Sequence, residues 1–271
     1  MPPRVLVTRP AREAAAWTEQ LRAHGIPAFA LPLIAVRACR DPASHAALAQ
    51  AWEQLPRYRA VMFVSANAVR CFFASKGAPE HTPTALEAPF LRAWAPGPGT
   101  ARALRAAGVA AAQIDGPAPD AVQFDSEALW QQVAPQVRPG DRILVVRGRA
   151  AGASAAPQAL GQGRDWLARQ IAAAGAQVDF VVAYERGAPR FTPTDLALAR
   201  QAAHDGTLWL LSSSEAVACL REALPGQTWD QARALSTHPR IAEAAHAAGF
   251  GQVHACRPAL EEVVASIESL A

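Results

Sequence analysis

The sequence has very little lysine, because Lys76 is the only one among its 26 basic residues. Its four cysteines (Cys39, Cys71, Cys219 and Cys256) are scattered and form no C-x-x-C pair, which excludes the common zinc and redox motifs. No apolar stretch approaches the roughly 20 residues that a membrane helix needs, and the amino terminus lacks a signal-peptide pattern. We therefore expect a cytoplasmic protein with reduced cysteines and no membrane association.

The phosphate-binding motifs of nucleotide enzymes are incomplete. A P-loop needs G-K-[ST], and the only lysine lies elsewhere. The run Gly97-Pro98-Gly99-Thr100 begins like a dinucleotide loop, but Arg102 stands where the third glycine belongs. The seven histidines show no metal-ligand spacing, and no serine lies in a G-x-S-x-G elbow. The sequence therefore disfavours a nucleotide, and we expect neither another cofactor nor a metal.

The formal charge of +3 at pH 7 does not require a nucleic-acid partner, and we expect none. Nearly all of the positive charge is nonetheless guanidinium, the group that binds carboxylates and phosphates through two hydrogen bonds. Codon bias in a GC-rich genome is the alternative explanation, which the abundant alanine and proline also favour. Arginine content alone therefore identifies no ligand.

The most informative pattern is an internal duplication. Residues 63–72 (FVSANAVRCF) recur as residues 211–220 (LSSSEAVACL), with Ser-x-x-Ala-Val in common. Residues 100–109 similarly match 241–250, and residues 6–25 match 144–175. The offsets between equivalent residues agree to within about ten residues, and the period is the size of a domain. The pattern indicates two similar domains that arose by gene duplication, rather than a solenoid.

Short apolar runs alternate with alanine-rich helical patterns along the chain. Strands are predicted at residues 4–8, 60–65, 93–95, 142–147, 207–212, 234–237 and 252–255. Helices are predicted at residues 11–24, 66–75, 99–107, 126–133, 165–174, 214–223, 240–248 and 259–270. A strand followed by a helix, repeated, predicts a parallel sheet with helices on its faces. We therefore expect each domain to be a small, doubly wound α/β fold.

Two extended segments follow helices that end at equivalent glycines. Gly25 leads into residues 27–37 and Gly175 leads into residues 177–186, and neither segment is followed at once by a helical pattern. If the two segments pair, they form a two-stranded connector, and the first strand and helix then belong with the C-terminal half. A tandem division near residue 138 is the alternative. Residues 150–163, which are small and uncharged, are predicted to be a flexible insertion.

Candidate ligand-binding residues follow the predicted strands, where ligands bind in doubly wound sheets. Hydroxyls, glycines and arginines gather there at helix N-termini, whose unpaired N–H groups attract anions. Helix capping is the alternative role for each serine and threonine. The segments are Thr8-Arg9-Pro10, Ser65-Ala66-Asn67, Gly97-Pro98-Gly99-Thr100, Arg147-Gly148-Arg149, Ser212-Ser213-Ser214 and Thr237-His238-Pro239-Arg240. Such a set predicts a polyanionic ligand large enough to touch both domains.

Two further side chains could take part in proton transfer. Tyr184, one of only two tyrosines, lies in the second connector segment, and a phenol there can donate a proton or a hydrogen bond to a leaving hydroxyl. His238 lies in a strand-to-helix loop and could act as a base. Packing for Tyr184, and capping or a surface position for His238, are the alternatives.

Together these segments resemble the uroporphyrinogen-III synthase family over nearly the full chain. No single segment is specific, but their order and spacing are. The segments on which the resemblance rests are residues 5–10 with Gly25 and 31–34, then 63–69, 97–101, 126–129, 144–148, 163–167, 184–186 and 212–217. Two departures stand out, since His238-Pro239-Arg240-Ile241 replaces the family's Gly-x-x-Thr turn, and residues 150–163 interrupt its Arg-Gly-x-x-Gly-Arg turn.

The resemblance implies two flavodoxin-like α/β domains with parallel sheets, joined by a two-stranded antiparallel connector. The first domain would comprise residues 1–36 and 178–271, and the inserted domain residues 40–175. It also implies a cofactor-independent lyase, here expected to be a monomer, that cyclises a linear tetrapyrrole, hydroxymethylbilane. The product would be uroporphyrinogen III, with the last ring inverted through a spiro intermediate, in haem biosynthesis.

The resemblance gives the candidate residues their expected roles. Tyr184 would be the catalytic donor to the departing hydroxyl. The other residues would bind the substrate's acetate and propionate groups, and they are Thr8, Arg9, Pro10, Ser65, Ala66, Asn67, Gly97, Gly99, Thr100, Arg147, Gly148, Ser212, Ser213, Ser214 and His238. A two-lobed, non-catalytic sensor of anions is the rival function, and it would bind a ligand without turnover.

Overall fold

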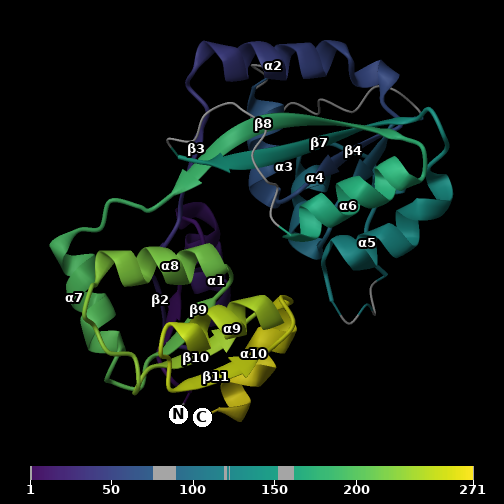
Figure 1. The fold of residues 1–271 in the computed structure, drawn as a ribbon. Helices are drawn as coiled ribbons and strands as arrows, with labels where there is room; N and C mark the ends of the chain where they lie inside the picture. Colours follow the sequence, from purple (N-terminus) through teal and green to yellow (C-terminus); the bar gives the residue numbers. More distant parts are fainter. Residues whose placement is uncertain (1, 76–89, 119–120, 122, 152–161, 271) are drawn as a thin grey trace. The chain divides into compact units, whose positions relative to one another are not determined.

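The fold is known from a computed structural model that describes residues 2–75, 90–118, 121, 123–151 and 162–270. The chain divides into two compact units (Figure 1). Unit 1 comprises Met1–Val36 and Gly187–Ala271, and unit 2 comprises Arg37–Arg186. The predicted flexible insertion at residues 150–163 lies largely outside the described residues.

Unit 1 is built on a five-stranded sheet in the order β2-β1-β9-β10-β11, and all four pairings are parallel. Counted along unit 1, this order is 2-1-3-4-5, the flavodoxin-like arrangement. The strands are β1 (Val5–Val7), β2 (Ala28–Ala30), β9 (Leu208–Leu211), β10 (Arg233–Ser236) and β11 (Gln252–Ala255). The helices are α1 (Ala11–Ala23), α7 (Pro193–Ala202), α8 (Ser214–Ala223), α9 (Pro239–Ala247) and α10 (Leu260–Ser269).

The strands of unit 1 are buried on both faces because their side chains alternate between two cores. One core joins alternate strand residues to α7, α8 and α9, and it contains Leu6, Trp209 and Leu211. The other joins the intervening strand residues to α1 and α10, and it contains Val5, Val7, Leu208 and Leu210. This double covering explains why the strands are apolar throughout rather than amphipathic.

Unit 2 has a six-stranded sheet in the order β3-β8-β7-β4-β5-β6. The pairings of β8 with β7, β7 with β4, β4 with β5 and β5 with β6 are parallel. The strands are β3 (Ala35–Ala38), β4 (Ala60–Phe63), β5 (Arg92–Trp94), β6 (Ile114–Asp115), β7 (Arg142–Ala150) and β8 (Gln177–Gly187). The helices are α2 (Pro42–Glu53), α3 (Ala66–Ala74), α4 (Pro98–Ala106), α5 (Ser126–Val133) and α6 (Gln162–Ala173).

The helices of unit 2 also cover its sheet on both faces. Helices α5 and α6 pack on one face, against a core that includes Met62 and Val145. An aromatic cluster joins strand β4 to α2 and α3, with Trp52 stacked on Phe72 (ring centroids 4.3 Å apart) and Phe72 edge-on to Phe63 (5.6 Å). The two mostly parallel, doubly covered sheets confirm the predicted α/β class.

The connecting strands differ from the prediction in one respect. Strand β3 lies beside β8, so the two segments are neighbours, but β8 also pairs with β7 from Gln177 to Arg186. The pair is therefore part of the second sheet, not a separate ribbon. Residues 178–186, which the sequence placed with residues 1–36, lie in unit 2 for the same reason.

The predicted strands and helices are present, but the sequence analysis missed several elements. Helices α2 and α7 and the two-residue strand β6 were not predicted, and the extended segment 27–37 is divided into β2 and β3. The predicted helix ends at Gly25 and Gly175 are present, where both glycines adopt a left-handed conformation with φ of 75° and 82°. Among the described residues, none of the helices combines the length and apolar character needed to cross a membrane.

Candidate functional site

Each sheet has a switch point, where neighbouring strands lead to helices on opposite faces. In unit 1 it lies between β1 and β9, and in unit 2 between β7 and β4. Ligands of flavodoxin-like sheets bind beyond the carboxyl ends of the strands at this point. Four of the six candidate segments adjoin these two edges, namely those containing Thr8, Ser212, Ser65 and Arg147. The other two, containing Gly97 and His238, follow the next strand in each sheet.

Helix α1 begins at the switch point of unit 1. Thr8 is buried, and its hydroxyl donates a hydrogen bond to the Leu210 carbonyl at 2.7 Å, so it ties the end of β1 to β9. The Arg9 guanidinium lies 4.3 Å from the centre of the Trp17 ring and 3.7 Å from the Glu13 carboxylate. Pro10 is the residue that precedes the helix. Arg9 is thus held over α1, with its charge at the carboxyl edge of the sheet.

Two more helix starts in unit 1 carry candidate residues. Ser213 precedes α8, but its side chain makes no capping hydrogen bond, and Ser212 and Ser214 flank it at half-buried and exposed positions. His238 precedes α9, and its Nδ1 accepts a hydrogen bond from the Arg240 N–H at 3.2 Å. His238 therefore caps a helix in this structure.

The corresponding helix starts of unit 2 are α3 and α4. Ala66 and Asn67 open α3, and the Asn67 carbonyl oxygen accepts a hydrogen bond from the Arg70 guanidinium at 2.6 Å. Gly97 precedes α4, and a Cβ added at Gly99 would meet no atom within 4 Å. Thr100 is buried. Among the described residues, helix α4 therefore begins without a side-chain cap.

The sequence analysis ended the strand at Arg147 and placed Gly148 and Arg149 in the loop beyond it, and this was wrong. Strand β7 continues to Ala150 because β8 supplies pairing partners as far as Arg186. The Arg147 guanidinium lies 5.5 Å from the centre of the Phe180 ring, on the neighbouring strand. Gly148 is buried inside the strand pair rather than exposed to a ligand.

Tyr184 and Ser65 are brought together, although they are far apart in the chain. The Tyr184 hydroxyl lies 3.1 Å from Ser65 Oγ, within hydrogen-bonding distance. Ser65 Oγ also accepts the Ala68 N–H at 3.2 Å and so caps α3. The Tyr184 side chain is otherwise buried, with 5% of the residue exposed. A phenol is thus fixed by its hydroxyl at the N-terminus of a helix, at the carboxyl edge of unit 2.

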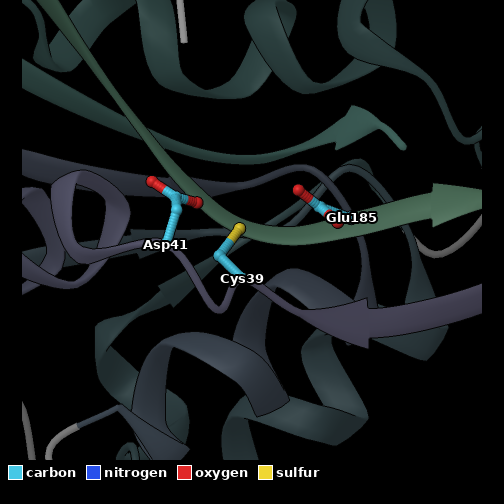
Figure 2. Close-up of side chains that lie close together, drawn as sticks. All are labelled: Cys39, Asp41 and Glu185. Atoms are coloured by element: carbon cyan, nitrogen blue, oxygen red, sulfur yellow. The ribbon is translucent and has the colours of Figure 1, made fainter. Parts of the chain in front are cut away.

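Beside Tyr184, the described residues contain a cluster of three groups that could ligate a metal, namely Cys39, Asp41 and Glu185 (Figure 2). Arg149 pairs with both carboxylates, since one of its terminal nitrogens lies 2.6 Å from an oxygen of Asp41 and 2.6 Å from an oxygen of Glu185. A metal ion would therefore have to displace a guanidinium from both carboxylates.

The ionisation of this cluster follows from its hydrogen bonds. Asp41 caps α2, and its hydrogen bond from the Ser44 N–H, with help from Arg149, lowers the pKa of the carboxyl from 3.8 to about 2. Burial raises the pKa of the Cys39 thiol. The cluster thus consists of a neutral thiol and an arginine that bridges the carboxylates of Asp41 and Glu185. This arrangement suits a structural role.

Comparison with known proteins decides the family. The family model described as Uroporphyrinogen-III synthase HemD matches residues 15–265. The chain belongs to the uroporphyrinogen-III synthase family. Membership implies an enzyme of haem biosynthesis, a cyclising lyase that acts on a tetrapyrrole substrate.

Two solved structures show the same fold. The crystal structure of uroporphyrinogen-III synthetase from Helicobacter pylori is 15% identical, with a TM-score of 0.56 over 99% of this chain and 100% of that one. A mutant uroporphyrinogen III synthase from Thermus thermophilus is 17% identical, with a TM-score of 0.51 over 98% of this chain and 96% of that one. At these identities the likeness supports the two-domain α/β fold alone.

The sequence analysis of this uroporphyrinogen-III synthase family member missed two features of the site. The Arg149 network joins residues 36 and 108 positions apart, and no local pattern indicates such pairs. Gly148 did carry a signal, since an isolated glycine within a strand often marks a close approach of another group. The signal was lost because the predicted strand ended at Arg147.

Proposed function

We propose that this chain converts hydroxymethylbilane into uroporphyrinogen III, with inversion of the last pyrrole ring and without a cofactor. The family match over residues 15–265 carries the assignment of the reaction. The hydrogen-bonded pair of Tyr184 and Ser65 at the switch point of unit 2 supports the assignment of the acid.

The reaction is a net loss of water. The hydroxymethyl C–O bond of the first ring breaks, the oxygen leaves with a proton as water, and the pyrrole N–H proton is lost, which leaves an electrophilic azafulvene. The substituted α-carbon of the last ring then bonds to the azafulvene methylene and forms a spiro intermediate. The old bond from this carbon to its bridging methylene breaks, and that methylene bonds to the free α-carbon, which loses its hydrogen, while the first-ring nitrogen regains a proton. Tyr184 would donate the hydrogen bond or proton that helps the oxygen to leave.

The protein's main task in this chemistry is to hold one conformer of a reactive chain, which is a matter of proximity and orientation. The substrate carries eight carboxylates, so it needs many anion sites. The N-termini of α1, α3, α4, α8 and α9 lie at the carboxyl edges of the two sheets and offer N–H groups and positive helix dipoles. Arg9 and Arg147 would add guanidinium groups. The steps break one C–O bond, exchange carbon–carbon bonds and move protons, with no net oxidation or reduction, which is why we propose no cofactor.

The proposal is tested by incubating the purified protein with hydroxymethylbilane and separating the product isomers after oxidation. The expected product is predominantly type III, formed well above the rate without protein. Type I product alone, at the spontaneous rate, would remove the proposal. The same assay after dialysis against a chelator tests cofactor independence, and activity that returns only when a metal is added would contradict it.

The setting of the enzyme is part of the proposal. We propose a cytoplasmic monomer that binds no nucleic acid. The formal charge of +3 does not require a nucleic-acid partner, and the four free cysteines suit a reducing compartment. Light scattering at several concentrations would test the oligomeric state, and a mass that doubles with concentration would contradict it.

A further inference from the structure

We infer that Ser65 and Gly148 are positioning residues for Tyr184: Gly148 leaves room for the phenol ring, and Ser65 fixes the direction of its hydroxyl. The inference rests on the proposed role of Tyr184 as the acid. It also changes the role expected for Ser65, from a ligand of substrate carboxylates to a residue that acts through Tyr184. Three independent observations carry it.

The first observation is the register between β7 and β8. Arg147 pairs with Val182, but the next residue, Gly148, pairs with Tyr184, so one residue of β8 is passed over. Such irregularities re-aim the side chains that follow them. Without the shift, Gly148 would lie beside Ala183 and Tyr184 beside Arg149. The shift therefore places the tyrosine next to the one residue of β7 that lacks a side chain.

The second observation is the space at Gly148. A Cβ built on this residue would lie 2.3 Å from Cε2, 2.4 Å from Cζ and 2.8 Å from Cδ2 of the Tyr184 ring. These distances are too short for carbon atoms, so the ring occupies the volume that any other residue would need. Gly148 is not among the glycines with positive φ, so its backbone would accept alanine. The requirement for glycine thus comes from the ring alone.

The third observation is the hydrogen bonding of Ser65. Its hydroxyl has one hydrogen and two lone pairs, and one lone pair already accepts the Ala68 N–H. When the Ser65 hydrogen is donated to the Tyr184 oxygen, the phenol hydrogen is left to point at a ligand. This gives a chain of donors that runs from the N-terminus of α3 through Ser65 to Tyr184. Each bond in such a chain polarises the next, and the helix dipole acts in the same direction.

The equivalent positions in unit 1 show that this arrangement is specific to unit 2. The repeat places Pro10 at the position of Gly148, and Ser213 at that of Ser65. Proline leaves no room for a ring, and the Ser213 side chain makes no capping hydrogen bond. The glycine, the capping serine and the tyrosine therefore occur together in the one unit that has the phenol.

The test is steady-state kinetics with hydroxymethylbilane, combined with product isomer analysis. Ser65→Ala and Gly148→Ala should each lower kcat about 10-fold to 100-fold with little change in KM, because a misplaced acid loses catalysis but not binding. Ser65→Thr, which keeps the hydroxyl, should retain most of the activity. In the Tyr184→Phe background, Ser65→Ala should lower kcat by less than about twofold further, since the two residues act as a unit.

A matched variant separates this effect from the loss of a helix cap. Asp125 caps α5 in the same unit by accepting the Ala128 N–H at 2.9 Å, so Asp125→Ala should lower the melting temperature about as much as Ser65→Ala but leave kcat unchanged. If Ser65→Ala instead raises KM, keeps kcat and is additive with Tyr184→Phe, Ser65 is a carboxylate ligand and the inference is overturned. Full activity of Tyr184→Phe alone would show that Tyr184 is not the acid. This outcome is distinct from any result of the Ser65 variants, so the two hypotheses can fail separately.

Discussion

At the scale of single residues, Arg149 shows how one cation can organise several segments. Its guanidinium joins β7 to Glu185 on β8, and to both Asp41 and Ser44 at the start of α2. Arginine suits this position because its planar fork presents several donors in fixed directions, which a lysine cannot do. Because Glu185 directly follows Tyr184, this network also holds the strand that carries the phenol.

The low pKa of Asp41 predicts a specific dependence of stability on pH. Its pKa falls from 3.8 to about 2 on folding, mainly through the Ser44 N–H, so the ionised carboxyl stabilises the folded state. That contribution is fully present above about pH 5 and is lost as the pH falls from about 4 to about 2. The difference in unfolding free energy between the wild type and Asp41→Asn should therefore shrink over this window.

Urea unfolding of both proteins at several pH values between about 2 and 6 measures this difference. A difference that stays constant, or grows, as the pH falls would show that Asp41 is not stabilised in its ionised form.

At the scale of elements, the two helices that the sequence analysis missed fully bury few large apolar side chains. Helix α7 buries only Ala199 and Ala202, and α2 buries Ser44, Leu48 and Ala51, so neither has a strong apolar stripe. Each helix also has proline at its first position. Proline usually interrupts a helical sequence pattern, but it is favourable in the first turn of a helix. By contrast, α5 and α8 bury leucine or valine at helical spacing, and their predicted bounds are correct.

Helix α7 should depend on its cap, because the residues it fully buries are two alanines, Ala199 and Ala202. Thr192 accepts the Asp195 N–H at 3.2 Å, and Asp195 accepts the Thr192 N–H at 2.9 Å, which makes a reciprocal capping box. Thr192→Ala should lower the free energy of unfolding by about 1 kcal/mol. Thr194, exposed in the same turn, provides the matched control, and Thr194→Ala should change it by less than about 0.5 kcal/mol. Equal losses in the two variants would contradict a capping role.

At the scale of the whole molecule, the two sequence copies do not correspond to the two folded units. The first copy supplies β1, β2, β4, β5 and β6, and the second supplies β7 to β11. The sheets, however, combine β1 and β2 with β9, β10 and β11, and β7 and β8 with β4, β5 and β6. Each unit thus takes the first two of its strands from one sequence copy and the last three from the other.

The sequence therefore predicted the components of the fold better than their pairing. The duplication indicated which strands are equivalent, but equivalent strands fit either sheet, so the partner of β1 could not be chosen from patterns. The site shows the same limit: Ser65 and Tyr184 were both candidates, but their contact depends on the pairing of β4 with β7 and of β7 with β8. Local patterns carry no information about such long-range register.

The exchange of strands predicts which fragments fold. A fragment of residues 35–187 contains the whole second sheet and its covering helices, so it should unfold cooperatively in urea by circular dichroism. A fragment of residues 1–138 contains parts of two sheets and should not. A cooperative transition in the second fragment alone would contradict the observed pairing.

The central claim is that the chain closes the ring through the substituted α-carbon of the last pyrrole. The most direct measurement uses hydroxymethylbilane labelled with carbon-13 at that α-carbon and at the hydroxymethyl carbon, followed by NMR of the product. The account predicts a one-bond coupling between the two labels, because the spiro step joins these carbons and the rearrangement keeps them joined. A product without that coupling, closed through the unsubstituted carbon, would contradict the account.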